Sequence, residues 1–138
     1  MDAKKLMLGD YVHLEYSKQN VKVSAIGQQH ISAWGVEGLI YEKDILPIPF
    51  TKDTFSKLGW NSYIDEEANE VRCNLKDTEG MCRIVWSSKF RSIDIEYHVT
   101  VFGKFDVCTR KVVMPCDYIH EFQQALRKAG ITKSEISI

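Results

Sequence analysis

The chain has 138 residues, which fits one ordinary domain with a substantial hydrophobic core. Its composition, 44% hydrophobic and 27% charged, is that of a globular protein and argues against a disordered tail or a membrane protein. A net charge of -1 argues against a generally basic nucleic-acid binder. No apolar run reaches the length of a signal peptide or a membrane span, so we expect a cytoplasmic protein without membrane contact.

The N-terminal third of the chain predicts a small antiparallel sheet. Apolar and polar residues alternate over 9–16 and 21–26, which predicts a hairpin, and two further short strands are predicted at 31–34 and 39–41. Glycines between these segments are typical of turns or bulges. Four short strands in so few residues indicate a small curled sheet, either an SH3-like barrel or a meander.

The segment from Ile45 to Trp60 predicts a junction between a strand and a short helix. Pro47 and Pro49 favour an extended path that leads into a helix over 52–58. Nothing in this segment singles out a catalytic group. We therefore interpret it as a structural element that fixes the path between two parts of the chain.

Both ends of this short helix have recognisable capping residues. Thr51 is the predicted N-cap, and Gly59 is expected to end the helix in the left-handed conformation. Phe50 and Phe55 occupy the two positions of a hydrophobic staple. These residues are expected to hold geometry and to contact no substrate.

The second half of the chain predicts an antiparallel sheet of about four strands followed by a helix. Residues 61–70 are polar and turn-rich, and the predicted strands follow at 71–76, 81–86, 93–101 and 107–114. The third of these is the most regular, with five apolar residues on one face and four polar residues on the other. Arg110 and Lys111 are placed to pair with Asp94 or Glu96 on the neighbouring strand.

The last predicted element is a helix over 118–129 that packs on this sheet. Asp117 is its expected N-cap, and a single apolar stripe runs along it through Ile119, Phe122, Leu126 and Ala129. Gly130 should close the helix in a Schellman motif, in which Leu126 contacts Ile131. Residues 132–138 are expected to form a short strand or a tail.

One candidate metal site comes from the most regular strand. Asp94, Glu96 and His98 lie at alternate positions and project from one face, where they could bind a divalent metal. Restriction-type nucleases place acidic residues on strands in a similar way, but their pattern continues with a lysine where this chain has His98. The ordinary solvent-facing side of an amphipathic strand also explains all three residues.

A second candidate is a surface that mixes cations and aromatic residues, as single-strand nucleic-acid binders do. Lys89, Arg91, Arg110 and Lys111 would have to share one surface for this function. The alternative is that the aromatic neighbours belong to the core and the cations to a solvated face.

Other kinds of chemistry have little support in the sequence. The four cysteines, Cys73, Cys82, Cys108 and Cys116, contain no C-x-x-C pair, so we expect thiols and assign no zinc site. No nucleophile elbow and no glycine-rich phosphate loop is present. A zinc-protease helix would need histidine at position 124, where this chain has Gln124. His120 is interpreted as a structural histidine with a hydrogen-bond partner.

Three stretches resemble a group of small proteins from Bacteroides-type bacteria and their phages. These are Leu8–Val12, then Leu46–Thr51 with the helix end at Leu58 and Gly59, and Asp117–Gln123. In that group a Pro-Ile-Pro segment leads into a short helix, and a Tyr-x-His segment follows later. The resemblance implies a bacterial intracellular protein encoded by a phage or another mobile element. The group has no assigned activity, so no residue inherits a role from it.

Taken together, the sequence predicts one α+β domain over residues 1–138 with two subregions, 1–46 and 47–138. The predicted function is that of a non-enzymatic binding or accessory protein, which uses a sheet surface or an exposed strand edge to bind a protein partner, alone or as a homodimer. The alternatives are a nucleic-acid-binding module and a metal-dependent nuclease or hydrolase that uses Asp94, Glu96 and His98. We assign no catalytic, cofactor-binding or metal-binding residue.

Overall fold

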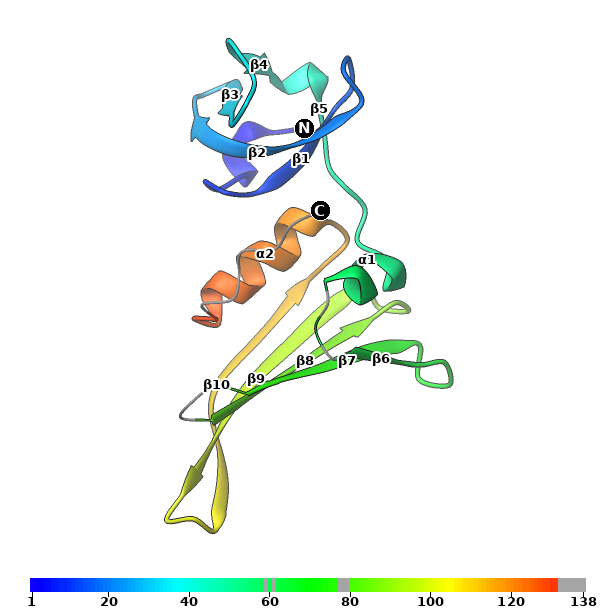
Figure 1. The fold of residues 1–138 in the computed structure, drawn as a ribbon, viewed down its shortest axis with the longest axis vertical. Coiled ribbons are helices and arrows are strands. Elements are labelled where there is room, and N and C mark those ends of the chain that lie inside the picture. The colour runs from blue at the N-terminus through cyan, green and yellow to red at the C-terminus, as the bar shows by residue number, and fades with distance from the viewer. Residues whose placement is uncertain (59, 61, 77–79, 132–138) are drawn as a thin grey trace.

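The computed structural model describes residues 1–58, 60, 62–76 and 80–131. It confirms the α+β class, with two antiparallel five-stranded sheets and two α-helices. Helix α2 (Ile119–Lys128) lies between the two sheets, below the N-terminal sheet and above the second sheet in the view of Figure 1. Its contacts with β1, β9 and β10 join the two parts of the chain.

The N-terminal sheet has the strand order β4-β3-β2-β1-β5. Its strands are β1 (Tyr11–Leu14), β2 (Gln19–Ile26), β3 (His30–Ala33), β4 (Ile40–Tyr41) and β5 (Ile45–Leu46). The first four lie where the sequence predicted strands, and β5 pairs with the free edge of β1. Short 3-10 helices precede β1 (Ala3–Lys5) and join β4 to β5 (Glu42–Asp44). This strand order is that of an SH3-like barrel. Inward-facing residues such as Val12, Leu14 and Ile31 form its own hydrophobic cluster.

The second sheet is a meander with the order β10-β9-β8-β7-β6. Its strands are β6 (Ser62–Asp65), β7 (Glu70–Lys76), β8 (Gly80–Ser87), β9 (Ser92–Val101) and β10 (Phe105–Pro115). The sequence predicted about four strands here, and the additional strand β6 lies in the stretch that was read as turn-rich. In β6 two polar residues flank Tyr63 and Ile64, and all four residues pair with β7.

One face of the second sheet packs on α1 (Lys52–Lys57) and α2. The rings at the centre of this core lie close together: Phe50 is 4.6 Å from Phe122 and 5.0 Å from Trp86 between centroids. Phe50 also contacts Phe55 at 5.8 Å, so the predicted staple forms. The predicted N-cap of α1 forms as well, since Thr51 Oγ1 accepts from the Thr54 N–H at 3.2 Å.

The two ends of α2 differ in how well the sequence predicted them. Asp117 is not its N-cap, because the Asp117 carboxylate binds Arg91 and Tyr118 occupies the N-cap position. Glu121 instead accepts from the Tyr118 N–H at 3.1 Å. The C-terminal end is as predicted. Gly130 has a φ of 74°, and the Ile131 N–H donates to the Leu126 carbonyl at 3.0 Å, which is the Schellman pattern.

Backbone hydrogen bonds pair the two segments that carry the family resemblance. The Phe50 N–H donates to the Asp117 carbonyl, and the Ile119 N–H donates to the Ile48 carbonyl, both at 2.8 Å. Pro49 and Tyr118 form an antiparallel bridge between these bonds. The proline segment therefore holds the start of α2, a contact that the sequence analysis did not predict.

The N-terminal barrel is attached to α2 by polar contacts. Asp10 is 0% exposed, and its carboxylate accepts from the Met7 N–H at 2.8 Å, from Gln124 Nε2 at 2.7 Å and from Arg127 Nη1. Gln123 bonds the barrel backbone through both ends of its amide group. The two hydrophobic clusters, one with members from Ala3 to Ile45 and one from Phe50 to Ala129, divide close to the predicted boundary after residue 46.

Some expectations fall on residues outside the described ranges. These are the left-handed conformation of Gly59 and the strand or tail at 132–138. Within the described ranges, no helix has both the length and the apolar character needed to cross a membrane.

Candidate functional site

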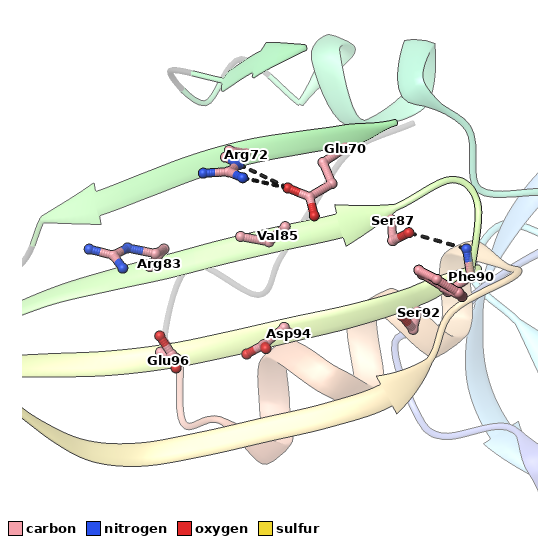
Figure 2. A pocket seen from close by; sticks show the side chains of 9 residues that line it. All are labelled: Glu70, Arg72, Arg83, Val85, Ser87, Phe90, Ser92, Asp94 and Glu96. Carbon is pink, nitrogen blue, oxygen red and sulfur yellow. Dashed lines mark hydrogen bonds and ion pairs between the residues drawn. The ribbon is translucent and has the colours of Figure 1, made fainter. Parts of the chain in front are cut away.

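The face of the second sheet opposite the helices carries a polar hollow of about 390 Å³. Figure 2 shows its lining residues, which come from β7, β8, β9 and the β8–β9 turn. They are Glu70, Arg72, Arg83, Val85, Ser87, Phe90, Ser92, Asp94 and Glu96. Both described α-helices pack on the other face of this sheet, so these side chains lie outside its hydrophobic core.

Strand register explains why these side chains meet. Residues directly opposite each other on neighbouring antiparallel strands project from the same face. Val85 on β8 lies opposite both Arg72 on β7 and Asp94 on β9, so these three form a row across the hollow. Arg83 and Glu96 lie in the adjacent row. Phe90 lies at one end, where its backbone N–H donates to Ser87 Oγ at 3.1 Å.

Four of the five charged residues that line the hollow form ion pairs, two with each other and two with Lys111 beside it. Arg72 donates to Glu70 Oε2 from Nε at 3.0 Å and from Nη2 at 2.7 Å. The hydrogen bond to Glu70 raises the pKa of Arg72 above its ordinary value. Lys111 on β10 approaches Asp94 Oδ2 at 3.7 Å and Glu96 Oε1 at 3.4 Å, which confirms the predicted cross-strand pairing for Lys111. The Asp94 charge, followed by the contacts with Glu96, raises the pKa of Lys111.

Two groups in the hollow differ from the rest. Among the described residues, Arg83 has no carboxylate within ion-pair distance. In the same part of the chain, Asp94 Oδ1 is shielded from solvent and has no hydrogen-bond partner. A shielded carboxylate oxygen without a donor costs free energy, but an atom that water cannot reach is not open to a ligand either. The hollow therefore offers a ligand one unpaired cation, the exposed Arg83.

The predicted metal triad is only partly assembled. Asp94, Glu96 and His98 do share the open face, and His98 Nε2 lies 3.3 Å from Glu96 Oε2. Asp94, however, is occupied by Lys111, and the third nearby ligand atom is the thiol of Cys108 on β10. The hydrogen bond with His98, and then that with Lys111, lowers the pKa of Glu96, so this carboxylate is ionised at neutral pH.

The predicted basic surface does not form as one patch. The Lys89 ammonium lies over the exposed Phe90 ring at 5.4 Å, whereas Arg91 binds Asp117 and the Phe50 carbonyl beside the core. The Arg110 guanidinium lies 4.4 Å over the Tyr97 ring, on the face of the sheet that packs on α2. Lys111, its neighbour on β10, projects from the opposite face, as alternation along a strand requires.

The remaining candidates are the four cysteines and His120, and all of them except Cys108 are buried. Cys73, Cys82 and Cys116 are buried and Cys108 is exposed, in agreement with the expected thiols. Burial raises the pKa of Cys73 to about 11. His120 is 5% exposed and stacks on the Tyr118 ring, but its Nδ1 has no hydrogen-bond partner among the described residues. The prediction of a hydrogen-bonded His120 is therefore wrong for that nitrogen.

Comparisons with known proteins give no indication of function, so the function is inferred from the geometry of the hollow. The chain matches no family model, no curated protein and no solved structure. The fold and the hollow together define a two-part α+β protein with a mixed-charge surface on an uncovered sheet.

Proposed function

We propose that the protein is a non-enzymatic binding protein whose recognition surface is the hollow on the open face of the second sheet. The ligand that fits best is a polypeptide segment carrying both a carboxylate and a cationic or N–H donor. Arg83 would bind the carboxylate, and the carboxylates of Glu70 and Glu96 in the same hollow would attract the donor. The exposed Arg83 guanidinium, which has no carboxylate partner among the described residues, is the single observation that carries this proposal.

The composition of the hollow supports a polypeptide ligand over a nucleic acid. Three carboxylates, from Glu70, Asp94 and Glu96, line it beside two arginines. A phosphate backbone would be repelled by these carboxylates, since nucleic-acid surfaces are predominantly basic. Phe90 and Val85 add apolar contact area at one end and in the centre, as protein interfaces commonly provide.

A metal-dependent hydrolase receives less support from the same face. Its predicted triad would need Asp94 as a ligand, and the Lys111 ammonium already occupies the neighbourhood of that carboxylate. Lys111 also lies 3.4 Å from Glu96 Oε1, so its positive charge would repel a metal ion held between the Asp94 and Glu96 carboxylates. The binding interpretation requires no rearrangement of these pairs.

Selection from a library of random short peptides displayed on phage tests this function. Immobilised protein should enrich peptides that carry both signs of charge, and the synthetic peptides should bind in solution. Arg83→Glu should weaken their binding by about tenfold or more, because it replaces a complementary charge with a repulsive one. Lys43→Glu is the matched control, since Lys43 is exposed on the N-terminal sheet region and the change in net charge is the same.

Two results would overturn the proposal. One is a selection that enriches no peptide above background on the folded wild-type protein. The other is peptide binding that Arg83→Glu and Lys43→Glu change equally. Salt-sensitive retention of a single-stranded oligonucleotide, lost in Lys111→Glu, would favour the nucleic-acid alternative in its place.

A further inference from the structure

We infer that Glu96, His98 and Cys108 form a site for a thiophilic divalent cation such as Zn²⁺, near the turn that joins β9 to β10. Their three ligand atoms lie within 4.8 Å of one another. A thiol, an imidazole and a carboxylate make up a typical donor set for zinc and an unsuitable one for magnesium or calcium, which prefer oxygen atoms only. The site does not depend on the proposed peptide-binding function.

The spacing of the first two ligands fits a tetrahedral ion. Zinc binds nitrogen and oxygen ligands at about 2.0–2.1 Å, so two such ligands at the tetrahedral angle stand about 3.3 Å apart. His98 Nε2 and Glu96 Oε2 are 3.3 Å apart.

A carboxylate behind the histidine supports the same reading. Asp106 Oδ1 lies 3.2 Å from His98 Nδ1, the ring nitrogen that does not face Glu96. A hydrogen bond from Nδ1–H to this carboxylate leaves the Nε2 lone pair directed toward the site. Metal-bound histidines usually have such a partner, which fixes the tautomer and the orientation of the ring. Asp106 is accordingly a positioning residue.

The second oxygen of Glu96 is held by a different group. Lys111 Nζ lies 3.4 Å from Glu96 Oε1, while Oε2 faces His98. The carboxylate is thus oriented from both sides. Cys108 is exposed, so the fourth coordination position would be open to water or to a ligand from a partner.

Strand geometry explains how Cys108 reaches the other two ligands. Cys108 lies directly opposite His98 in the β9–β10 ladder, and the register shifts immediately afterwards, between Cys108 and Arg110. Such β-bulges redirect side chains and are frequent beside functional sites. The bulge places Cys108 on the open face and Arg110 on the covered face.

The position of the site gives the ion a structural role. Among the described residues, the last pair between β8 and β9 is Gly80 with Val99, and β9 and β10 continue past it to the turn that joins them. This end of the hairpin exposes Phe102 and Phe105, which are 88% and 61% accessible. A two-stranded hairpin is only marginally stable by itself, so an ion that joins His98 to Cys108 would brace the hairpin near its turn.

Titration of the reduced protein with Co²⁺, a spectroscopic substitute for Zn²⁺, tests this site without any peptide ligand. The wild type should bind one ion per chain with a thiolate-to-cobalt charge-transfer band that added Zn²⁺ removes. Cys108→Ser should abolish the band, and His98→Gln should weaken Co²⁺ binding by about tenfold or more. Asp106→Asn should weaken the affinity by about 10–100-fold and retain the band.

His13→Gln is the matched control, since His13 contacts Asn20 on the N-terminal sheet, away from the proposed site. This variant should bind Co²⁺ with the affinity of the wild type. Circular dichroism checks that each variant is folded. If another variant unfolds, loss of the charge-transfer band in Cys108→Ala tests the site. The absence of a charge-transfer band in the wild type would overturn the inference, as would a band that persists in both Cys108 variants.

Discussion

The polar junction between the N-terminal barrel and α2 makes a quantitative prediction about stability. Asp10 is completely buried, and Arg127 is the only cation that contacts it among the described residues. Arg127→Met would remove the charge while preserving most of the length and the apolar stem of the side chain. The Asp10 carboxylate would then keep the Met7 N–H and the Gln124 amide as donors, but it would be a buried charge without a counter-ion.

The expected loss can be estimated from these contacts. Removing one partner of a buried ion pair costs about 3–5 kcal/mol, chiefly through the charge left behind. The Arg127 side chain is 25% exposed and two donors to Asp10 remain, so we expect the lower end, about 3 kcal/mol. For an m-value of about 1.5 kcal/mol/M, this loss moves the urea midpoint by about 2 M.

Equilibrium urea unfolding of matched variants measures this loss. Lys128→Met is the control, because Lys128 is the next residue in the last turn of α2 and is exposed. It should change the free energy of unfolding by no more than about 0.5 kcal/mol. Asp10→Asn combined with Arg127→Met should lose less than the sum of the single variants, with a coupling of about 2 kcal/mol. Equal midpoints for the Arg127 and Lys128 variants would refute the reasoning.

Three further predictions concern the core and its titratable groups. Phe122→Ala should lower the free energy of unfolding by about 3–5 kcal/mol, since Phe122 is 0% exposed and stacks on Phe50; a loss below about 1 kcal/mol in urea unfolding would contradict that packing. Burial lowers the pKa of His120, so the unfolded chain protonates first as the pH falls; stability should be complete above about pH 6.5 and decline below it. His120→Phe, which retains a ring against Tyr118, should lose less stability than the wild type between about pH 7 and 5.5, and equal losses would count against this assignment. A thiol reagent should label Cys108 rapidly in the folded protein and the buried Cys73 and Cys116 only after unfolding, because burial raises the pKa of both buried thiols; rapid labelling of Cys116 in native protein would contradict the fold.

Local signals predicted much of the fold correctly. The alternation over 93–101, the Thr51 cap and the Schellman pattern at Gly130 each depend on neighbouring residues, and each is present in the structure. Strand β6 was missed because it is only four residues long, shows no alternation of polar and apolar residues, and depends for its place in the sheet on pairing with β7. Tertiary pairing of this kind leaves little trace in local hydrophobic periodicity.

The candidate site shows the same division between local and long-range information. Alternation along β9 correctly placed Asp94, Glu96 and His98 on one face, but Asp94 supplies none of the three ligand atoms that lie close together. Cys108 was missed because its position opposite His98 depends on the register of β10 and on the bulge that follows. The Asp117 cap failed for a similar reason, since its carboxylate is taken by Arg91, which is distant in sequence.

The open face of the second sheet is the central claim of this account, and methyl NMR tests it most directly. Val85 lies in the middle of the hollow, whereas Val36 packs against the hydrophobic cluster of the N-terminal barrel. On titration with a synthetic peptide from the phage selection, the Val85 methyl signals should shift progressively and those of Val36 should remain unchanged. Shifts confined to Val36 and its neighbours, with Val85 unaffected at saturation, would contradict the assignment of the recognition surface.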